Sequence, residues 1–363
     1  MSRVEIQSRR PWQAPEERQR LVDSELGQFD PENAGQVRRF IWELEASTLA
    51  LSALSSALEA GILDHLAAPQ ALPEISQRTG VPAPLVEGLL DVLVGLRLVR
   101  RAGDEFVCEP GLASWASGRA KEFLLASLHS DRLQSSELVE RSKKKVLSLD
   151  GWYSSDPEIL EAQGTRSAQL VGAWVQSSFP LLDGLVERLT APSGNFLDVG
   201  TGVGALAIEM CRQFPNLRVV GIDPFESALT LAQRKIAEAR LEGRIELRAQ
   251  RVEELVDDSY FDLVHIPAPF LSTEVLALGL KRVMTALRPG GWLFLQTLAV
   301  PGPELTPALF RLFCLLWGSE AVLPEQAAKM VVEAGYDNVQ VLPSIPGVPV
   351  QAVAGQRPFH SSH

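Results

Sequence analysis

One stretch of nine residues, FLDVGTGVG at 196–204, constrains the fold of this chain more than any other. Its first half is a short, mainly apolar run of the kind found in buried parallel strands. Gly200, Gly202 and Gly204 follow at alternate positions. They allow a sharp turn and a close approach of backbone to a ligand, where a Cβ would clash. The next residues, ALAIEMCRQF, have helical character, so the loop opens a helix whose first N–H groups point at whatever lies there.

Three further strands are predicted after this loop. LRVVGIDP at 217–224 ends in Asp223, nineteen positions after Gly204, where a carboxylate is placed to accept hydrogen bonds from ribose hydroxyls. FDLVHI at 261–266 is a third core strand, and ALRPGGWLFLQTL at 286–298 reads as a helix end, a Pro-Gly-Gly turn and a strand. Because strands and helices alternate from residue 195 onwards, we expect an α/β fold with a doubly wound parallel sheet.

The glycine loop alone would suit NAD, FAD or S-adenosylmethionine (SAM). The loop together with GIDP, FDLV and LRPGGWLFL resembles the successive motifs of class I SAM-dependent methyltransferases. The glycine spacing is G-x-G-x-G, whereas NAD enzymes more often show G-x-G-x-x-G. The resemblance implies SAM as cofactor and S-adenosylhomocysteine (SAH) as product. It places Asp198 and the three glycines beside the amino-acid end of SAM, Asp223 on the ribose, and Pro224 and Phe225 against the adenine; Phe225 is equally suited to core packing.

The adenine corner departs from the family pattern. Arg251 in IELRAQRVEEL stands where the family usually has an Asp that contacts the adenine amino group. Arginine has no acceptor, but the amide carbonyl of the preceding Gln250 accepts the same hydrogen bond. We therefore treat Gln250 and Arg251 as cofactor-site candidates, with the acceptor for the amino group left open.

The residues expected to act on the methyl acceptor also depart from the family pattern. The small-molecule O-methyltransferases use a His shortly after the fourth strand, a position that falls near Leu271 here. His265, inside or at the end of the strand, is the alternative candidate base, and it also faces the cofactor cleft in this interpretation; a His bonded within the strand end is an equal possibility. Glu320 lies roughly where the family has a pocket glutamate and is the second candidate base; the alternative is an ordinary helix-capping or surface carboxylate. Candidate walls of the acceptor pocket are aromatic: Trp152, Tyr153, Trp174, Phe270 and Trp317.

The N-terminal half predicts a winged helix-turn-helix. A long helix is expected from Ala34 to Ala60, then two shorter helices separated by a turn at Gly80, and a charged two-stranded wing. In the second short helix Leu85, Leu89, Val92 and Leu96 form one apolar stripe. That helix offers Glu87 and Asp91 against Arg97, so it lacks the basic side chains that bind DNA. The segment resembles the N-terminal dimerisation domain of bacterial and plant small-molecule O-methyltransferases, which implies a homodimer.

Five segments are predicted in total. They are a flexible arm (1–33), the winged-helix dimerisation domain (34–118), a helical linker with pocket residues (119–190), the SAM-binding catalytic domain (191–357) and a disordered tail (358–363).

Composition limits the partners and the compartment. The net charge is −11, from 34 basic and 45 acidic residues, which disfavours nucleic acid and anionic membranes. Three cysteines far apart in the sequence indicate free thiols in a reducing compartment. The five histidines form no metal motif, and neither a signal peptide nor a membrane-spanning stretch is apparent. We expect a cytoplasmic protein without a metal.

The sequence thus predicts a SAM-dependent methyltransferase that acts on a small, mostly apolar acceptor, in secondary metabolism. The architecture favours transfer to oxygen, whereas the missing His favours carbon or nitrogen. The alternative is a protein that binds SAM or a metabolite for regulation or for chemistry other than methyl transfer.

Overall fold

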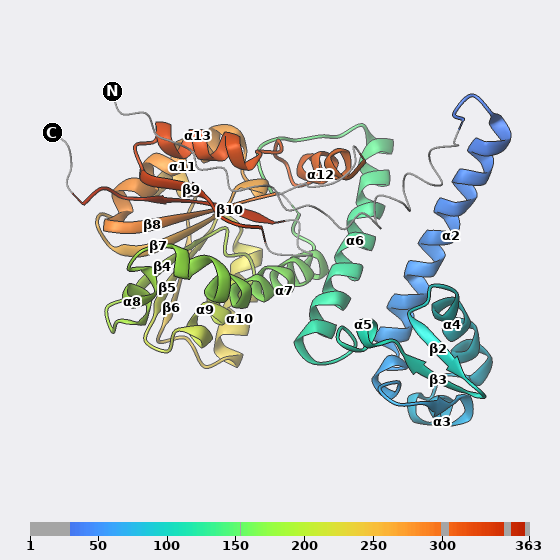
Figure 1. The fold of residues 1–363 in the computed structure, drawn as a ribbon. Helices are drawn as coiled ribbons and strands as arrows, with labels where there is room; N and C mark the ends of the chain where they lie inside the picture. The colour runs from blue at the N-terminus through green and yellow to red at the C-terminus, as the bar shows by residue number, and fades with distance from the viewer. Residues whose placement is uncertain (1–29, 153, 299–304, 345–349, 360–363) are drawn as a thin grey trace. The chain divides into compact units, whose positions relative to one another are not determined.

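The computed structural model describes residues 30–152, 154–298, 305–344 and 350–359. It divides into two compact units, Met1–Ala113 and Ser114–His363 (Figure 1). The expected flexible arm and disordered tail lie almost wholly outside the described residues, and so does Tyr153. The segment 119–190, expected to be a separate linker, belongs to the second unit.

The N-terminal unit has the predicted helix-turn-helix with a wing. Helix α2 (Ala34–Glu59) begins where the Asn33 side chain accepts hydrogen bonds from two backbone N–H groups, as an N-cap should. The wing is a small antiparallel sheet with the strand order β1-β3-β2. The remaining elements are η1 (Leu63–His65), β1 (Gln70–Ala71), α3 (Leu72–Thr79), α4 (Ala83–Gly95), β2 (Val99–Ala102), β3 (Glu105–Cys108) and α5 (Pro110–Ala113).

Helix α4 carries two apolar stripes. Val86, Leu90 and Leu93 are fully buried in the core of the unit. The stripe recognised from the sequence lies beside the buried one, about a quarter-turn around the helix, where Leu85 and Leu96 are among the exposed large hydrophobic residues. Helix α2 also exposes apolar side chains, namely Ile41, Trp42, Leu44, Leu49 and Leu51. Two helices of one small unit therefore present apolar surface that this unit does not itself cover.

The C-terminal unit is built on a seven-stranded sheet with the order β6-β5-β4-β7-β8-β10-β9. The first five strands in this order are parallel, and β10 pairs antiparallel with both β8 and β9. This confirms the predicted α/β fold, to whose parallel strands β10 and β9 add an antiparallel edge. The strands are β4 (Asn195–Val199), β5 (Arg218–Asp223), β6 (Ile245–Ala249), β7 (Phe261–Pro267), β8 (Leu287–Thr297), β9 (Asp337–Val341) and β10 (Gln351–Gln356).

Helices cover both faces of this sheet (Figure 1). One core cluster joins α7, α8, α9 and α10 to alternate strand residues such as Phe196 and Phe294. The other joins α11 and α13 to the intervening residues such as Leu197 and Leu295. This alternation is what a sheet buried on both sides requires. The helices are α6 (Gly118–Lys144), α7 (Pro157–Ala173), α8 (Leu185–Thr190), α9 (Ala205–Gln213), α10 (Glu226–Glu238), α11 (Thr273–Ala286), α12 (Leu305–Leu316) and α13 (Pro324–Glu333).

The helical segment that begins with α7 is interrupted. Helix α7 passes at Trp174 into a π-helical turn (Trp174–Ser178) and a 3-10 turn (Phe179–Leu181) before α8 begins. One local expectation needs correction. The Pro-Gly-Gly sequence does not precede the last parallel strand but lies within β8, which pairs irregularly with β7 at that point. None of the described helices is long and apolar enough to cross a membrane.

The topology fixes the place of the glycine loop. Strands β4, β5 and β6 follow one another outward in the sheet, and the chain then returns to lay β7 on the other side of β4. The carboxyl end of β4 is therefore the point where the strand order reverses, which is where open α/β sheets bind their ligands.

Candidate cofactor site

The glycine loop has the backbone that its sequence predicts. Gly200, Gly202 and Gly204 have φ angles of 65°, 54° and 73°, a left-handed region that other residues adopt only at a cost. A Cβ on Gly204 would also lie 3.3 Å from the Cβ of Ala232 on α10. The loop thus depends on glycine for its conformation and, at Gly204, for its packing.

Asp198, in the strand that precedes the loop, stabilises the loop through a side-chain hydrogen bond. This buried carboxylate accepts a hydrogen bond from the Thr201 hydroxyl at 2.8 Å through Oδ2, and its Oδ1 lies 3.0 Å from His265 Nδ1. Thr201 in turn is fitted against Gly221 of β5, where a Cβ would approach its Oγ1 to 2.8 Å. Both carboxylate oxygens of Asp198 are therefore committed to the protein.

The candidate base His265 is buried and already bonded on both sides. Its Nδ1 faces Asp198, and its Nε2 lies 3.2 Å from Oε1 of Gln296 on β8. The Trp174 ring packs beside the imidazole with 5.2 Å between ring centroids. His265 lines the pocket, but neither ring nitrogen is left over to take a proton from an acceptor without breaking one of these contacts.

Asp223 is the second buried carboxylate. Its Oδ2 accepts the Gly202 N–H and its Oδ1 accepts the Phe225 N–H, both at 2.9 Å. Burial raises the pKa of the Asp223 carboxyl, against the two backbone donors that favour its ionised form. Each oxygen still has a second lone pair, so a ligand with two neighbouring hydroxyls finds acceptors here.

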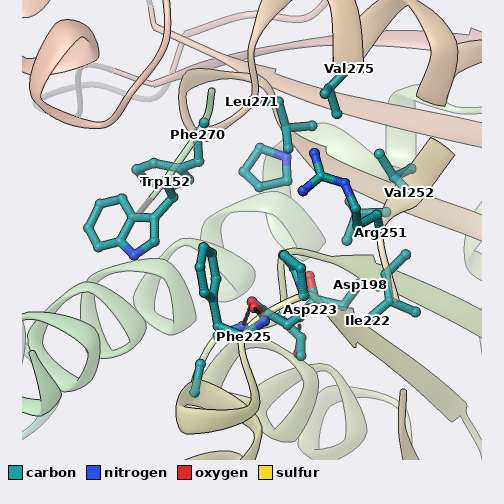
Figure 2. A pocket seen from close by; sticks show the side chains of 18 of the residues that line it. Trp152, Asp198, Ile222, Asp223, Phe225, Arg251, Val252, Phe270, Leu271 and Val275 are labelled. Atoms are coloured by element: carbon teal, nitrogen blue, oxygen red, sulfur yellow. Dashed lines mark hydrogen bonds between the residues drawn. The ribbon is translucent and has the colours of Figure 1, made fainter. Parts of the chain in front are cut away.

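These groups surround one cavity, here called the central pocket. Its volume, open mouth included, is about 1160 Å³. Figure 2 shows Trp152 at one side, Arg251 and Val252 at the other, and Asp223 with Phe225 between them. The backbone around Trp152 is fixed by two hydrogen bonds. The Trp152 backbone N–H donates to the Phe270 carbonyl, and the Gly151 backbone N–H donates to the Gly318 carbonyl.

The donors and acceptors of the pocket fit SAM. Besides Asp223, two pocket residues carry a buried acceptor oxygen without a hydrogen-bond partner among the described residues, namely Oε1 of Gln163 on α7 and Oε2 of Glu253 after β6. Such atoms cost free energy unless a ligand or water pairs with them. SAM has N–H donors at its ammonium and adenine ends and hydroxyls between them, so it offers a donor for each acceptor group.

The other predicted site residues divide into two groups. Pro224, Phe225, Gln250, Arg251, Trp152 and Phe270 line the central pocket with the loop residues. Glu320 is exposed and lies outside the pocket lining, while Trp174 and Trp317 are buried and pack against Phe294 and Phe270 respectively.

Sequence reasoning missed Gln163, Glu253 and Gln296. A polar residue in an amphipathic helix, a glutamate in a charged turn and a glutamine in a strand carry no local signal. Only the packing of α7 and β8 around the loop brings Gln163 and Gln296 to the site.

Comparison with known proteins agrees with this geometry. Residues 196–291 match the methyltransferase domain family, and residues 42–115 match the O-methyltransferase dimerisation domain. A ubiquinone/menaquinone biosynthesis C-methyltransferase, UbiE of Geotalea daltonii, is 30% identical over 128 residues, which are 34% of this chain and 54% of that protein. The chain thus spans about half the length of this curated relative.

Solved structures share nearly the whole fold. An O-methyltransferase family protein from Burkholderia thailandensis superposes with a TM-score of 0.63 at 17% identity, covering 88% of this chain and 97% of its own. CalO1, a methyltransferase in calicheamicin biosynthesis solved with SAH, superposes with a TM-score of 0.60 at 17% identity, covering 89% and 98%. At such identities the likeness shows the fold.

Fold, loop and the two domain matches define the class. The chain therefore contains a methyltransferase domain (196–291) and an O-methyltransferase dimerisation domain (42–115), on a fold that it shares with an O-methyltransferase family protein of solved structure. SAM is the cofactor of this class.

Proposed function

We propose that this protein is a homodimeric, cytoplasmic enzyme that transfers a methyl group from SAM to a small, mostly apolar acceptor of secondary metabolism. One observation carries the proposal: a loop of three glycines with positive φ at the reversal point of the sheet, with the buried Asp223 carboxylate directly beside it. The reducing compartment is supported by three cysteines that are free and buried, Cys108, Cys211 and Cys314.

The residues of the site have mainly positioning roles. SAM, when bound, supplies a methyl group on a sulfonium centre. The C–S bond breaks on transfer, and the neutral thioether SAH is the leaving group. Asp223 accepts the ribose hydroxyls, and the glycine loop leaves room for the amino-acid end. Trp152 and Phe270 narrow the pocket on one side, with ring centroids 5.2 Å apart in an edge-to-face contact. Holding two reactants in line supplies up to about 7–11 kcal/mol of the barrier reduction.

The state of His265 favours an acceptor that needs little help from a base. An oxygen acceptor such as a phenol must lose a proton near neutral pH, yet both ring nitrogens of His265 are occupied by Asp198 and Gln296. An activated ring carbon, as in quinol substrates, attacks the methyl group without a prior deprotonation at that carbon. The ring proton leaves only after the transfer, when the cationic adduct is acidic enough to give it to water. The similarity to a quinone-pathway C-methyltransferase supports this candidate, while the dimerisation domain supports transfer to oxygen.

A product assay separates these candidates. The purified protein is incubated with methyl-labelled SAM and one of three acceptors, an electron-rich quinol, a catechol or an aromatic amine. Mass spectrometry then locates the label. Label on a ring carbon supports C-methylation, and label on oxygen supports O-methylation. SAH released without any methylated product indicates non-methyl chemistry, and failure to bind SAH would refute the whole proposal.

A further inference from the structure

The sheet fixes the direction in which a nucleoside lies in the central pocket. The glycine loop follows β4, Asp223 ends the neighbouring β5, and Gln250 begins the segment after β6, one strand further out. A ligand with its ribose at Asp223 and its amino-acid end at the glycine loop therefore points its base beyond β5, toward the turn η4 (Val252–Glu254). Figure 2 shows Val252 and Arg251 on this side of the pocket.

The turn η4 is held firmly in place. The Gln250 N–H donates to the Asp223 carbonyl at 3.2 Å, and its side-chain Nε2 donates to the Glu254 carbonyl at 3.0 Å. Arg282 of α11 donates through Nε to the Glu253 carbonyl at 3.2 Å. The side chains of this turn are therefore presented from a rigid backbone, as a recognition site requires.

Glu253 is the unusual member of this turn. Its Oε1 accepts a hydrogen bond from Nε of Arg251, while its Oε2 is buried without a partner. Arg251 is itself half exposed, so it steadies the carboxylate from the solvent side. Leaving a buried carboxylate oxygen unpaired costs about 1–3 kcal/mol or more. Oε2 is shielded from solvent, but Glu253 lines the central pocket, so a turn of the carboxylate toward a donor on the ligand would remove that cost.

We infer that Glu253 accepts the hydrogen bond from the adenine 6-amino group and so sets the preference for adenine, with Arg251 as a positioning residue that orients it. This inference rests on the proposed function and names a residue of the same site. It also explains the presence of Arg251 at this position. Arginine cannot accept a hydrogen bond, but here it donates one to the carboxylate of Glu253. Gln250 is the competing acceptor, and the experiment must separate the two.

The test measures binding of SAH by calorimetry, with an SAH analogue that has hydrogen in place of the purine 6-amino group. Wild-type protein should bind SAH roughly 10–100-fold more tightly than the analogue, the factor that corresponds to a hydrogen bond with a charged group. In Glu253→Ala the affinity for SAH should fall by this factor and the affinity for the analogue should not. Glu253→Gln, which keeps a neutral acceptor, should lose less.

Two control variants separate the alternatives. Gln250→Ala should still discriminate between SAH and the analogue, and Arg251→Ala should discriminate only slightly less than the wild type. Thermal unfolding without ligand should show Glu253→Ala about as stable as the wild type, because the lost contact to Arg251 is offset by the removal of an unpaired buried oxygen. A purely structural Glu253 would lower stability and leave the discrimination between SAH and the analogue unchanged.

Discrimination that survives in Glu253→Ala, or that disappears in Gln250→Ala, would overturn the inference and leave the proposed function intact. A wild-type protein that binds neither compound would overturn both.

Discussion

At the scale of single residues, two buried carboxylates fix the glycine loop before any ligand arrives. Asp198 accepts a hydrogen bond from the Thr201 hydroxyl, and Asp223 accepts one from the Gly202 N–H. Both contacts lie within the loop or next to it, so its conformation does not have to be created by the ligand. A preformed loop reduces the entropy that is lost on binding.

Asp223→Asn should weaken SAH binding by roughly 10–100-fold, since it removes a charged acceptor. The pH dependence supplies the diagnostic. Because burial raises the pKa of Asp223, the wild-type carboxyl takes up a proton at a higher pH than an ordinary aspartate, and SAH affinity should fall as the pH drops through that value. The Asn variant cannot take up this proton, so its affinity should lack this acidic decline. Calorimetry over a pH series measures both; an identical decline in the two proteins would contradict the ribose assignment.

His265→Gln should lower SAH affinity by roughly 3–10-fold, because loss of the contact to the Asp198 carboxylate loosens the glycine loop; only part of the free energy of that hydrogen bond is passed on to the ligand. A residue that acted only as a base would leave SAH binding unchanged and would reduce turnover alone. Calorimetry with SAH, set beside the pH profile of kcat, distinguishes these roles. Unchanged affinity with a kcat that loses its pH dependence would restore His265 as the base.

At the scale of elements, α7 touches the glycine loop at one narrow point. A Cβ on Gly164 would lie 2.3 Å from Cγ2 of Val203, inside any normal contact distance. Valine has few alternative rotamers, so it has little room to yield. Helix α7 and the glycine loop can therefore pack this closely only because Gly164 has no Cβ.

Gly164→Ala should destabilise the protein by about 1–3 kcal/mol through overpacking and should also weaken SAH binding by displacing Val203. Gly172→Ala in the same helix is the matched control, since its Cβ meets nothing within 4 Å. By helix propensity it should be neutral or stabilising by up to about 1 kcal/mol. Denaturant unfolding and SAH calorimetry test the pair; equal behaviour of the two variants would show that the close contact has no consequence.

At the scale of the whole molecule, the exposed apolar side chains of α2 and α4, except that of Ile41, belong to the part of the chain that matches a dimerisation domain. An apolar surface of this kind is typical of a protein interface. A second copy of the chain is the occupant that the domain match indicates.

Leu49→Glu should shift the protein from dimer toward monomer, because it places a charge in the apolar face of α2, where Leu49 is 72% exposed. Val256→Glu is the control, since Val256 is 85% exposed but belongs to the C-terminal unit. Light scattering after gel filtration over a concentration series measures the mass. A monomeric wild type, or equal masses for both variants and the wild type, would contradict the dimer.

The sequence by itself determined the parts of this protein that depend on local order. Apolar runs of strand length and glycines at alternate positions identify the fold and the cofactor, and Asp223 at a strand end predicts the ribose carboxylate, because each signal lies within a few neighbouring residues. The apolar stripe of α4 was recognised in the same way, although its periodicity did not show that a second stripe supplies the core.

Only the tertiary structure decided the rest. Asp198 on β4 and Gln296 on β8 occupy the two nitrogens of His265, and these partners are 67 and 31 residues away in the chain. Gln163 and Glu253 reach one pocket from a helix and a turn on either side of the glycine loop. Whether a side chain is bonded, buried or free depends on segments that only the folded sheet brings together, and no local pattern records that.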